Sequence, residues 1–415
     1  MKIGLLGFGT VGSGVYEIIS KSNNFIIKNI EINKILTRNV KINSKNIMTD
    51  NIDEVLNYKG INLVVEAIGG IHPAYEYIMS ALKSGKHVVT ANKAVVSKYL
   101  EEFTQTANKN NVAFLYEASV GGGIPWIKSI KQAKRIDEIS EINGIFNGTS
   151  NFILYNMFEK GYDFNDILKI AQEKGYAEAD PSADIDGTDI QRKLAITSSV
   201  AFDTIVKEEN IPTFGIRYIT KKDIEFFKKH NLTLKLIATS IRNNDEYCSC
   251  VEPVLFKDDT IEANVSDNFN IGSLIGESIG ELKFYGQGAG KLPTGNAIVQ
   301  DIIDIYTGGY VNYPYGFNKI LKLNQELLKG RYYIRFSNTN TLSILKNVIE
   351  NFSVNIESIE SIKSDVAVTN DTDYAADINN IETVIFTKKL SLKEAQQLFN
   401  EIRKLESNLF YARFN

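Results

Sequence analysis

Histidine, cysteine and long apolar runs are scarce in this chain of 415 residues, and each scarcity argues against a class of protein. The three histidines form no recognisable motif, which argues against a histidine triad or a histidine-rich metal centre. The two cysteines, Cys248 and Cys250, are expected on opposite faces of a strand and predict no metal quartet. No apolar run approaches the length of a membrane span, so we expect no membrane association.

The rest of the composition is that of an ordinary soluble globular protein. Hydrophobic residues make up 43% and charged residues 23% of the chain, and the formal net charge is -4. Without a basic excess, we expect no nucleic-acid partner. The length predicts two or three domains. The chain opens on a strand rather than a signal peptide, and the low cysteine content fits a reducing compartment, so we expect a cytoplasmic location.

The densest group of charged side chains lies in residues 178–193, EADPSADIDGTDIQRK. The apolar run after Lys193 predicts the buried part of a helix, with Asp186 as its N-terminal cap. Asp189 and Lys193 are four residues apart and therefore share a helix face. A carboxylate beside an ammonium could bind an amino acid there and pass a proton. The carboxylates of the stretch are Glu178, Asp180, Asp184, Asp186 and Asp189.

Three interpretations compete for this stretch. The simplest is a solvated loop with an ordinary i,i+4 ion pair, which is common and weak. A calcium loop fails, because an EF-hand register starting at Ser182 puts Lys193 where a bidentate glutamate is required. The third interpretation is a catalytic site, and the remainder of the chain has to decide between it and the solvated loop.

A glycine motif near the N-terminus predicts dinucleotide binding. A strand runs into Gly7, Gly9 and Gly12, and a helix follows, which is the setting that G-x-G-x-x-G requires. The second strand, residues 30–38, ends in Arg38 rather than in an acidic residue. An arginine there favours a 2′-phosphate and hence NADP over NAD. NAD, with Arg38 in a solvated loop, stays open as the alternative.

Alternating strands and helices over the first part of the chain predict an α/β fold with a Rossmann-type doubly wound parallel sheet. Lys93 follows a strand at the edge where such sheets bind ligands. Residues 117–126, EASVGGGIPW, leave carbonyl groups exposed and form either a cation-binding loop or a hinge. Beyond residue 136 the pattern is α+β. From about residue 329 it is βαββαβ, which is typical of a ferredoxin-like module.

Four motifs together resemble the homoserine dehydrogenase family in its long form, which carries a C-terminal ACT domain. They are TANKA (90–94), EASVGGG (117–123), NGTSN (147–151) and, close to diagnostic, GYAEADPSADIDGTDIQRKLAI (175–196). The resemblance implies NAD(P)-dependent interconversion of L-aspartate 4-semialdehyde and L-homoserine in threonine and methionine biosynthesis. It also implies a homodimer or higher homo-oligomer. The expected domains are dinucleotide-binding (1–130 plus about 290–320), substrate-binding and dimerising (131–289), and ACT-like (329–415).

The resemblance also implies roles for single residues. Lys193 is the proton donor and acceptor, and Lys93 lies beside the nicotinamide and the substrate. The candidates for binding the amino-acid substrate are Glu178, Asp184 and Asp189. The cofactor candidates, from the motif and the resemblance together, are Gly7, Gly9, Thr10, Val11, Gly12, Arg38, Lys93 and Gly175. A monovalent cation, expected to be sodium, falls on Glu117, Val120, Gly122 and Ile124.

A pair of lysines suits this reaction. Hydride addition to an aldehyde leaves charge on the oxygen, which needs a proton or a positive neighbour. A second lysine nearby would lower the pKa of the first and make it a better acid near neutral pH. Two other hypotheses are another amino-acid dehydrogenase on the same fold and an inactive NADP-binding amino-acid sensor. Against the sensor, both lysines and all five carboxylates are intact.

The ACT-like module departs from its family at one turn. ACT domains commonly carry Asp-x-Pro-Gly between the first strand and the first helix. Here Asn340, Leu342 and Ser343 replace the Asp, Pro and Gly. A charged acceptor for an effector's ammonium is thereby lost. The sequence therefore predicts that the module folds and that inhibition by threonine is weak or absent.

Overall fold

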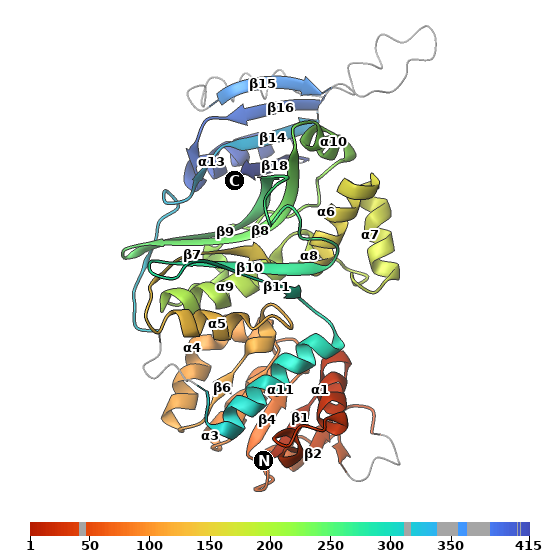
Figure 1. Ribbon diagram of the computed structural model, residues 1–415, viewed down its shortest axis with the longest axis vertical. Coiled ribbons are helices and arrows are strands. Elements are labelled where there is room, and N and C mark those ends of the chain that lie inside the picture. The colour runs from red at the N-terminus through yellow and green to blue at the C-terminus, as the bar shows by residue number, and fades with distance from the viewer. Residues whose placement is uncertain (41–46, 311–316, 338–355, 363–381, 405, 407) are drawn as a thin grey trace. The chain divides into compact units, whose positions relative to one another are not determined.

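The computed structural model describes residues 1–40, 47–310, 317–337, 356–362, 382–404, 406 and 408–415 (Figure 1). It divides into two compact units, each made of several chain segments. The first unit comprises Met1–Gly148, Gln191–Ile211 and Phe269–Leu321, and the second comprises Thr149–Ile190, Pro212–Asn268 and Lys322–Asn415. The predicted boundaries of three domains stay a prediction. Within the described part of the chain, no helix is long and apolar enough to cross a membrane.

Six strands of the first unit form a parallel sheet in the order β3-β2-β1-β4-β5-β6. They are β1 (Lys2–Leu6), β2 (Glu31–Leu36), β3 (Met48–Thr49), β4 (Leu63–Glu66), β5 (His87–Thr90) and β6 (Phe114–Leu115). The central strand β4 is buried along its whole length, as expected for a sheet covered on both faces. The strand order reverses between β1 and β4, which is where doubly wound sheets bind ligands. The Rossmann-type prediction is confirmed.

Two pairs of helices pack on this sheet. Helices α1 (Thr10–Lys21) and α11 (Lys291–Thr307) lie side by side (Figure 1) and share a core with strand residues such as Ile3 and Leu5. Helices α3 (Ala74–Lys83) and α4 (Lys93–Lys109) contact each other; α3 also contacts β4 and β5, and α4 contacts the edge strand β6. Helix α11 therefore brings a segment from far along the chain to the N-terminal sheet.

The first unit also contains three antiparallel strands and several short helices. In these strands β10 pairs with both β7 and β11. Pro125 immediately precedes α5, as the sequence predicted. The elements are α2 (Asp53–Leu56), α5 (Trp126–Ala133), most of α9 (Thr188–Phe202), the 3-10 turns η1 (Ile27–Asn29), η2 (Glu117–Ser119) and η3 (Glu208–Asn210), and strands β7 (Ile139–Ile145), β10 (Phe269–Gly276) and β11 (Gly280–Gln287).

The second unit combines helices with a mixed sheet in the order β8-β9-β18-β14-β16-β15. Its helices are α6 (Gly148–Lys160), α7 (Phe164–Glu173), α8 (Ser182–Ile185), α10 (Lys221–Lys229) and α13 (Leu392–Arg403). Its strands are β8 (Leu232–Asn243), β9 (Glu246–Lys257), β12 (Lys322–Leu323), β13 (Lys329–Gly330), β14 (Tyr332–Ser337), β15 (Ile356–Ile362), β16 (Glu382–Thr387), β17 (Leu390–Ser391) and β18 (Phe410–Phe414). The predicted first helix of the C-terminal module and its altered turn lie outside the described residues, and the ACT assignment stays a prediction.

Two local predictions are wrong. Cys248 and Cys250 belong to one buried cluster, because alternate residues of a strand share a face. Asp186 does not cap α9. It ends α8 instead, and its carboxylate accepts two hydrogen bonds from Arg217, at 2.7 and 2.6 Å. Arg217 lies 31 residues further along the chain, so the local pattern could not reveal this pairing.

A buried ion pair joins α10 to β14 in the second unit. Oδ1 of Asp223 accepts hydrogen bonds from the hydroxyl of Tyr333 at 2.7 Å and from Nε of Arg335 at 2.8 Å. Asp223 is 0% and Arg335 2% exposed. The Asp223 carboxylate also completes a capping box with Thr220 at the start of α10. The fold of this unit therefore depends on two charges that are far from water and must neutralise each other.

Replacing Asp223 by asparagine should therefore be costly. We expect Asp223→Asn to lower the free energy of unfolding by about 3–5 kcal/mol, because the Arg335 charge stays buried without its carboxylate. The control is Glu401→Gln, which removes half of an exposed 2.6 Å pair with Lys404 and should cost at most about 1 kcal/mol. Urea unfolding of both variants measures the difference, and equal losses would contradict the role given to Asp223.

Candidate active site

The glycine turn after β1 borders a cavity of about 690 Å³ in the first unit. Gly7 has a φ of +99°, and a side chain there would come within 2.5 Å of the Ala67 oxygen, so only glycine fits. A Cβ on Gly9 would meet nothing within 4 Å, which leaves the backbone open to a ligand. Gly9 also precedes α1 without a side-chain cap, so the first N–H groups of the helix can bind a pyrophosphate.

The cavity brings together residues from several strand ends. Gly7, Gly9 and Arg38, three of the predicted cofactor residues, all line it, and Thr10, Val11 and Gly12 follow in the first turn of α1. Asp50, which the sequence analysis did not single out, lines the same cavity. Arginine suits a 2′-phosphate, whereas a carboxylate suits the free ribose hydroxyl of NAD. The cavity lining therefore includes one side chain suited to NADP, Arg38, and one suited to NAD, Asp50.

A buried carboxylate that the sequence analysis missed holds the ends of β4 and β5 together. Glu66 is 0% exposed, and it accepts hydrogen bonds from two N–H groups of the following turn and from Oγ1 of Thr90 at 2.6 Å. Burial raises the pKa of Glu66, and these hydrogen bonds lower it. Asn92 caps α4 and donates to the Gly70 oxygen at 2.6 Å. Thr90 and Asn92 of the TANKA motif thus fix the turn that precedes Lys93.

The two predicted catalytic lysines both belong to the first unit. Lys93 is the first residue of α4 and directly follows the Asn92 cap. Lys193 lies on α9 and is 8% exposed, and its Nζ donates to the Phe146 oxygen at 2.5 Å. A buried ammonium is uncommon unless it has polar partners. Its burial makes Lys193 a candidate for proton transfer rather than a surface charge.

Glu208 links the two lysine-bearing helices. Its carboxylate accepts a hydrogen bond from the Ser97 hydroxyl on α4 and lies 3.5 Å from Nε of Arg192 on α9. Its backbone oxygen accepts a further hydrogen bond from Gln191, at 3.0 Å. The sequence analysis did not single out Glu208, because it lies in a short polar connection with no motif. The relative position of α4 and α9 depends on this residue.

The predicted substrate residues and Gly175 belong to the second unit. Gly175 follows the end of α7 with a φ of +74°. Glu178 is exposed, Asp184 lies half-buried in α8, and Asp189 is 4% exposed in the first turn of α9. In the described part of the chain, no group of three or more His, Cys, Asp and Glu side chains could hold a metal ion.

The loop of residues 117–124 offers backbone oxygens rather than a carboxylate. The Glu117 side chain accepts hydrogen bonds from the N–H groups of Ile127 and Lys128, at 2.9 and 2.7 Å, and so caps α5. Burial raises the pKa of Glu117 to about 7. Gly122 has a φ of +57°, and a Cβ there would lie 2.4 Å from the carbonyl carbon of Gly288. The loop is thus packed backbone to backbone, and its carbonyl groups are the type of ligand that hard cations take.

Asn270 is another residue that the sequence analysis missed. Its side chain is 0% exposed, and among the described residues neither its Nδ2 nor its Oδ1 has a hydrogen-bond partner. A Cβ on Gly288 would lie 1.9 Å from this Nδ2, so the amide packs against the glycine-rich turn of residues 286–290. A buried amide costs free energy until a polar group pairs with it. The turn therefore suits a polar ligand or a water molecule.

The parallel sheet, the glycine turn and the buried lysine define a dinucleotide-dependent oxidoreductase. Family models described as the NAD binding domain of homoserine dehydrogenase and as homoserine dehydrogenase match residues 7–117 and 125–303. A curated homoserine dehydrogenase from Synechocystis sp. is 40% identical over 316 residues, covering 74% of this chain and 73% of that protein. The chain belongs to the homoserine dehydrogenase family.

Solved structures agree with this assignment. A homoserine dehydrogenase from Thiobacillus denitrificans has a TM-score of 0.85 at 30% identity and covers 100% of this chain and 98% of its own. A hyperthermophilic archaeal homoserine dehydrogenase in complex with NADPH has a TM-score of 0.65 at 26% identity, covering 75% of this chain and 99% of its own. The family resemblance, the α/β fold, the oxidoreductase class and the nicotinamide cofactor are confirmed. Nothing in the comparisons favours an inactive sensor or another amino-acid dehydrogenase.

The packing of residues 117–124 can be tested with a matched pair of glycines. Gly161→Ala should incur only the cost of a left-handed residue, about 1–2 kcal/mol, since Gly161 has a φ of +68° and open space around it. Gly122→Ala should lose clearly more, because its Cβ would also overlap the Gly288 backbone. Urea unfolding measures both. A loss for Gly122→Ala no larger than the control would show that the loop is not held against Gly288.

Proposed function

We propose that this chain interconverts L-aspartate 4-semialdehyde and L-homoserine, the activity of its family, with Lys193 as proton donor and acceptor. The observation that carries the proposal is the buried ammonium of Lys193 beside the Phe146 oxygen. A bound nicotinamide cofactor would supply or take the hydride. Lys193 then gives a proton to the oxygen of the reduced aldehyde, or takes one from homoserine. Lys93 adds a second positive charge that stabilises the developing alkoxide.

The other assignments follow from the residues and the family resemblance. Glu178, Asp184 and Asp189 bind the substrate's ammonium group, and the burial of Asp189 supports a specific role. Arg38 binds the 2′-phosphate of NADP, with NAD as the alternative that Asp50 would favour. The cofactor also contacts Gly7, Gly9, Thr10, Val11, Gly12, Lys93 and Gly175.

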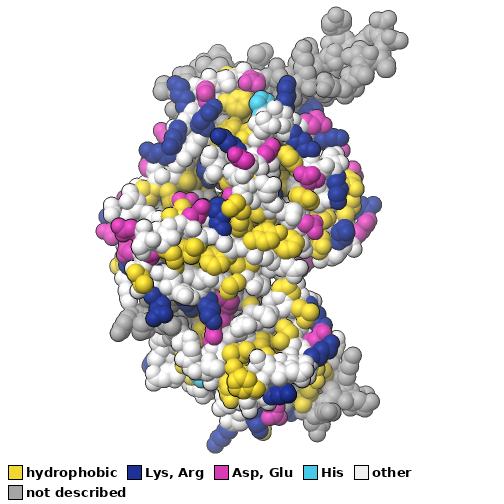
Figure 2. All heavy atoms as spheres, in the orientation of Figure 1, with side chains coloured by type: hydrophobic (Ala, Val, Ile, Leu, Met, Phe, Trp, Pro, Cys, Tyr) yellow, Lys and Arg dark blue, Asp and Glu magenta, His cyan; other side chains and the backbone are white. Residues whose placement is uncertain are grey.

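A sodium ion is proposed at the backbone oxygens of Glu117, Val120, Gly122 and Ile124. The side chain of Glu117 supports this proposal. Its carboxylate is used to cap α5, so Glu117 would bind the ion through its backbone carbonyl oxygen. We also infer, from the family resemblance, a cytoplasmic homodimer or higher homo-oligomer. Acidic and basic side chains are interspersed over the face in Figure 2 rather than gathered by sign, which gives no support to a nucleic-acid partner.

The proton-transfer role is tested by replacing one buried lysine and comparing it with another. Lys193→Met should lose about 10²–10⁴-fold in kcat while NADPH binding changes little. Lys235 is the matched control, since it is 1% exposed and its Nζ donates to the Val265 oxygen at 2.6 Å. Lys235→Met should retain turnover. Steady-state kinetics and fluorescence titration measure both, and a loss below about tenfold for Lys193→Met would remove Lys193 from this role.

Cofactor choice is tested at the two charged residues of the first cavity. Arg38→Gln should weaken NADPH binding by about tenfold or more and NADH binding much less, because one charge-assisted phosphate contact is lost. Asp50→Asn is the comparison, and any effect should fall on NADH. Dissociation constants for both cofactors and both variants decide the matter. Equal weakening of the two cofactors by Arg38→Gln would show that Arg38 does not bind the 2′-phosphate.

A further inference from the structure

Helix α4, which begins at Lys93, is not one regular helix. Its backbone geometry is interrupted at Tyr99, where φ is −125° and ψ is 20°. The residues before this kink, 93–98, form a short first segment of α4 with Lys93 at its start. A helix is stiff only while its backbone geometry is regular, so the rest of α4 holds this segment less firmly than an unbroken helix would. The position of Lys93 therefore depends on contacts made by the segment itself.

Side chains hold both ends of this first segment. At its start, Asn92 caps the helix and donates a hydrogen bond to the turn after β4. Near its end, the Ser97 hydroxyl donates to Oε1 of Glu208. Ser97 lies four residues after Lys93 and therefore on the same face of the helix. Glu208 thus holds the segment about one helical turn from Lys93.

The 3-10 turn η3, in which Glu208 lies, is fixed in turn to the beginning of α9. Nε2 of Gln191 donates to the backbone oxygens of Glu208 and Ile211, at 3.0 and 2.8 Å. Oε2 of Glu208 lies 3.5 Å from Nε of Arg192, and Arg192 directly precedes Lys193. One carboxylate therefore contacts the first segment of α4 with one oxygen and the beginning of α9 with the other.

These contacts are better suited to placing a side chain than to holding the fold. Ser97, Arg192 and Glu208 line a cavity of about 530 Å³ that α4, α9 and η3 surround. The side chains of Arg192 and Glu208 are 38% and 29% exposed, and an ion pair in such a setting adds little to stability. A displacement of about 1 Å can nevertheless cost about a hundredfold in the rate of a reaction.

We propose that Glu208 is a positioning residue of the reaction, which sets the place of Lys93 relative to Lys193. The inference rests on the proposed function, because it takes both lysines as groups that act on the substrate oxygen. Glu208 does not act on the substrate. It acts through Ser97 and Arg192, and its role requires the length of a glutamate side chain, since a shorter acid would not reach Ser97.

This length requirement is tested with three substitutions at Glu208. Glu208→Gln keeps the length and an oxygen that accepts from Ser97, so it should keep most of kcat. Glu208→Asp keeps the charge but is one methylene shorter, and Glu208→Ala removes both the length and the charge. We expect these two variants to lose about 10–10²-fold in kcat, with smaller changes in the KM for homoserine and in the Kd for NADPH. Steady-state kinetics per mole of folded enzyme and fluorescence titration measure these values.

Further variants separate positioning from folding. Ser97→Ala should lower kcat as Glu208→Ala does, and the double variant should lose little more than either, because all three break the same contact. Glu209→Ala is the matched control, since the Glu209 side chain is 71% exposed and lies 3.9 Å from Nζ of Lys207. Its kcat should be unchanged. Urea unfolding of Glu208→Ala should give a midpoint close to that of the control.

An unchanged kcat in Glu208→Ala would overturn the inference. So would a larger loss in Glu208→Gln than in Glu208→Asp, which would assign the effect to the charge rather than to the length. If the wild-type chain interconverts the two substrates and the Glu208 variants do so equally well, only this inference fails. If the wild-type chain has no such activity, the proposed function fails with it.

Discussion

The hydrogen bonds of one buried carboxylate, Glu66, hold the ligand-binding edge of the parallel sheet. The hydroxyl of Thr90 and the turn after β4 meet on it, and Asn92 ties the start of α4 to the same turn. Burying an acid is costly, and here several donors offset the cost, so the arrangement is specific as well as stable. Lys93 is the next residue after Asn92. The position of a proposed catalytic lysine is therefore set by a carboxylate that no motif includes.

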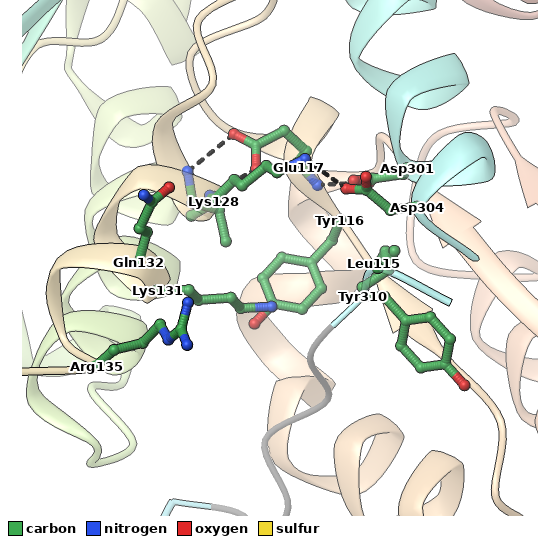
Figure 3. Close-up of a pocket in the computed structure, with 12 residues that line it drawn as sticks. Leu115, Tyr116, Glu117, Lys128, Lys131, Gln132, Arg135, Asp301, Asp304 and Tyr310 are labelled. Atoms are coloured by element: carbon green, nitrogen blue, oxygen red, sulfur yellow. Dashed lines mark hydrogen bonds and ion pairs between the residues drawn. The ribbon is translucent and has the colours of Figure 1, made fainter. Parts of the chain in front are cut away.

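A second constraint is the way Glu117 joins three parts of the first unit. Its carboxylate starts α5, its N–H binds Asp301 of α11, and its chain continues into the loop proposed to hold sodium. A cavity of about 300 Å³ lies between the same two helices, and Glu117 forms part of its lining (Figure 3).

Local patterns were sufficient for the parallel sheet, the glycine turn and most helices, because a strand or a helix start depends on neighbours a few residues away. Pairings across the chain were not predicted. Asp186 binds Arg217 instead of capping α9, and the Asn270 amide packs on Gly288. The family motifs supplied the candidate lysines and carboxylates, but not Glu66 and Glu208, which support them. In the sequence, such supporting residues are marked only by a polar side chain at the end of an apolar strand or in a short connection, which is a weak signal.

Two residues of the NGTSN motif, Thr149 and Asn151, hold other parts of the second unit in place. Asn151 donates to the Val265 oxygen at 3.1 Å and accepts from Nζ of Lys235 at 3.1 Å, so it is fully occupied in supporting the second unit. Thr149 donates to the Tyr176 oxygen at 2.6 Å, directly after Gly175. Thr149 therefore helps to position the turn at Gly175. Lys235 is more buried than Lys193, at 1% against 8% exposed, and like Lys193 it donates to a backbone oxygen. Burial and a carbonyl partner therefore do not identify a catalytic lysine by themselves, and Lys193 is distinguished by the family motif in which it lies.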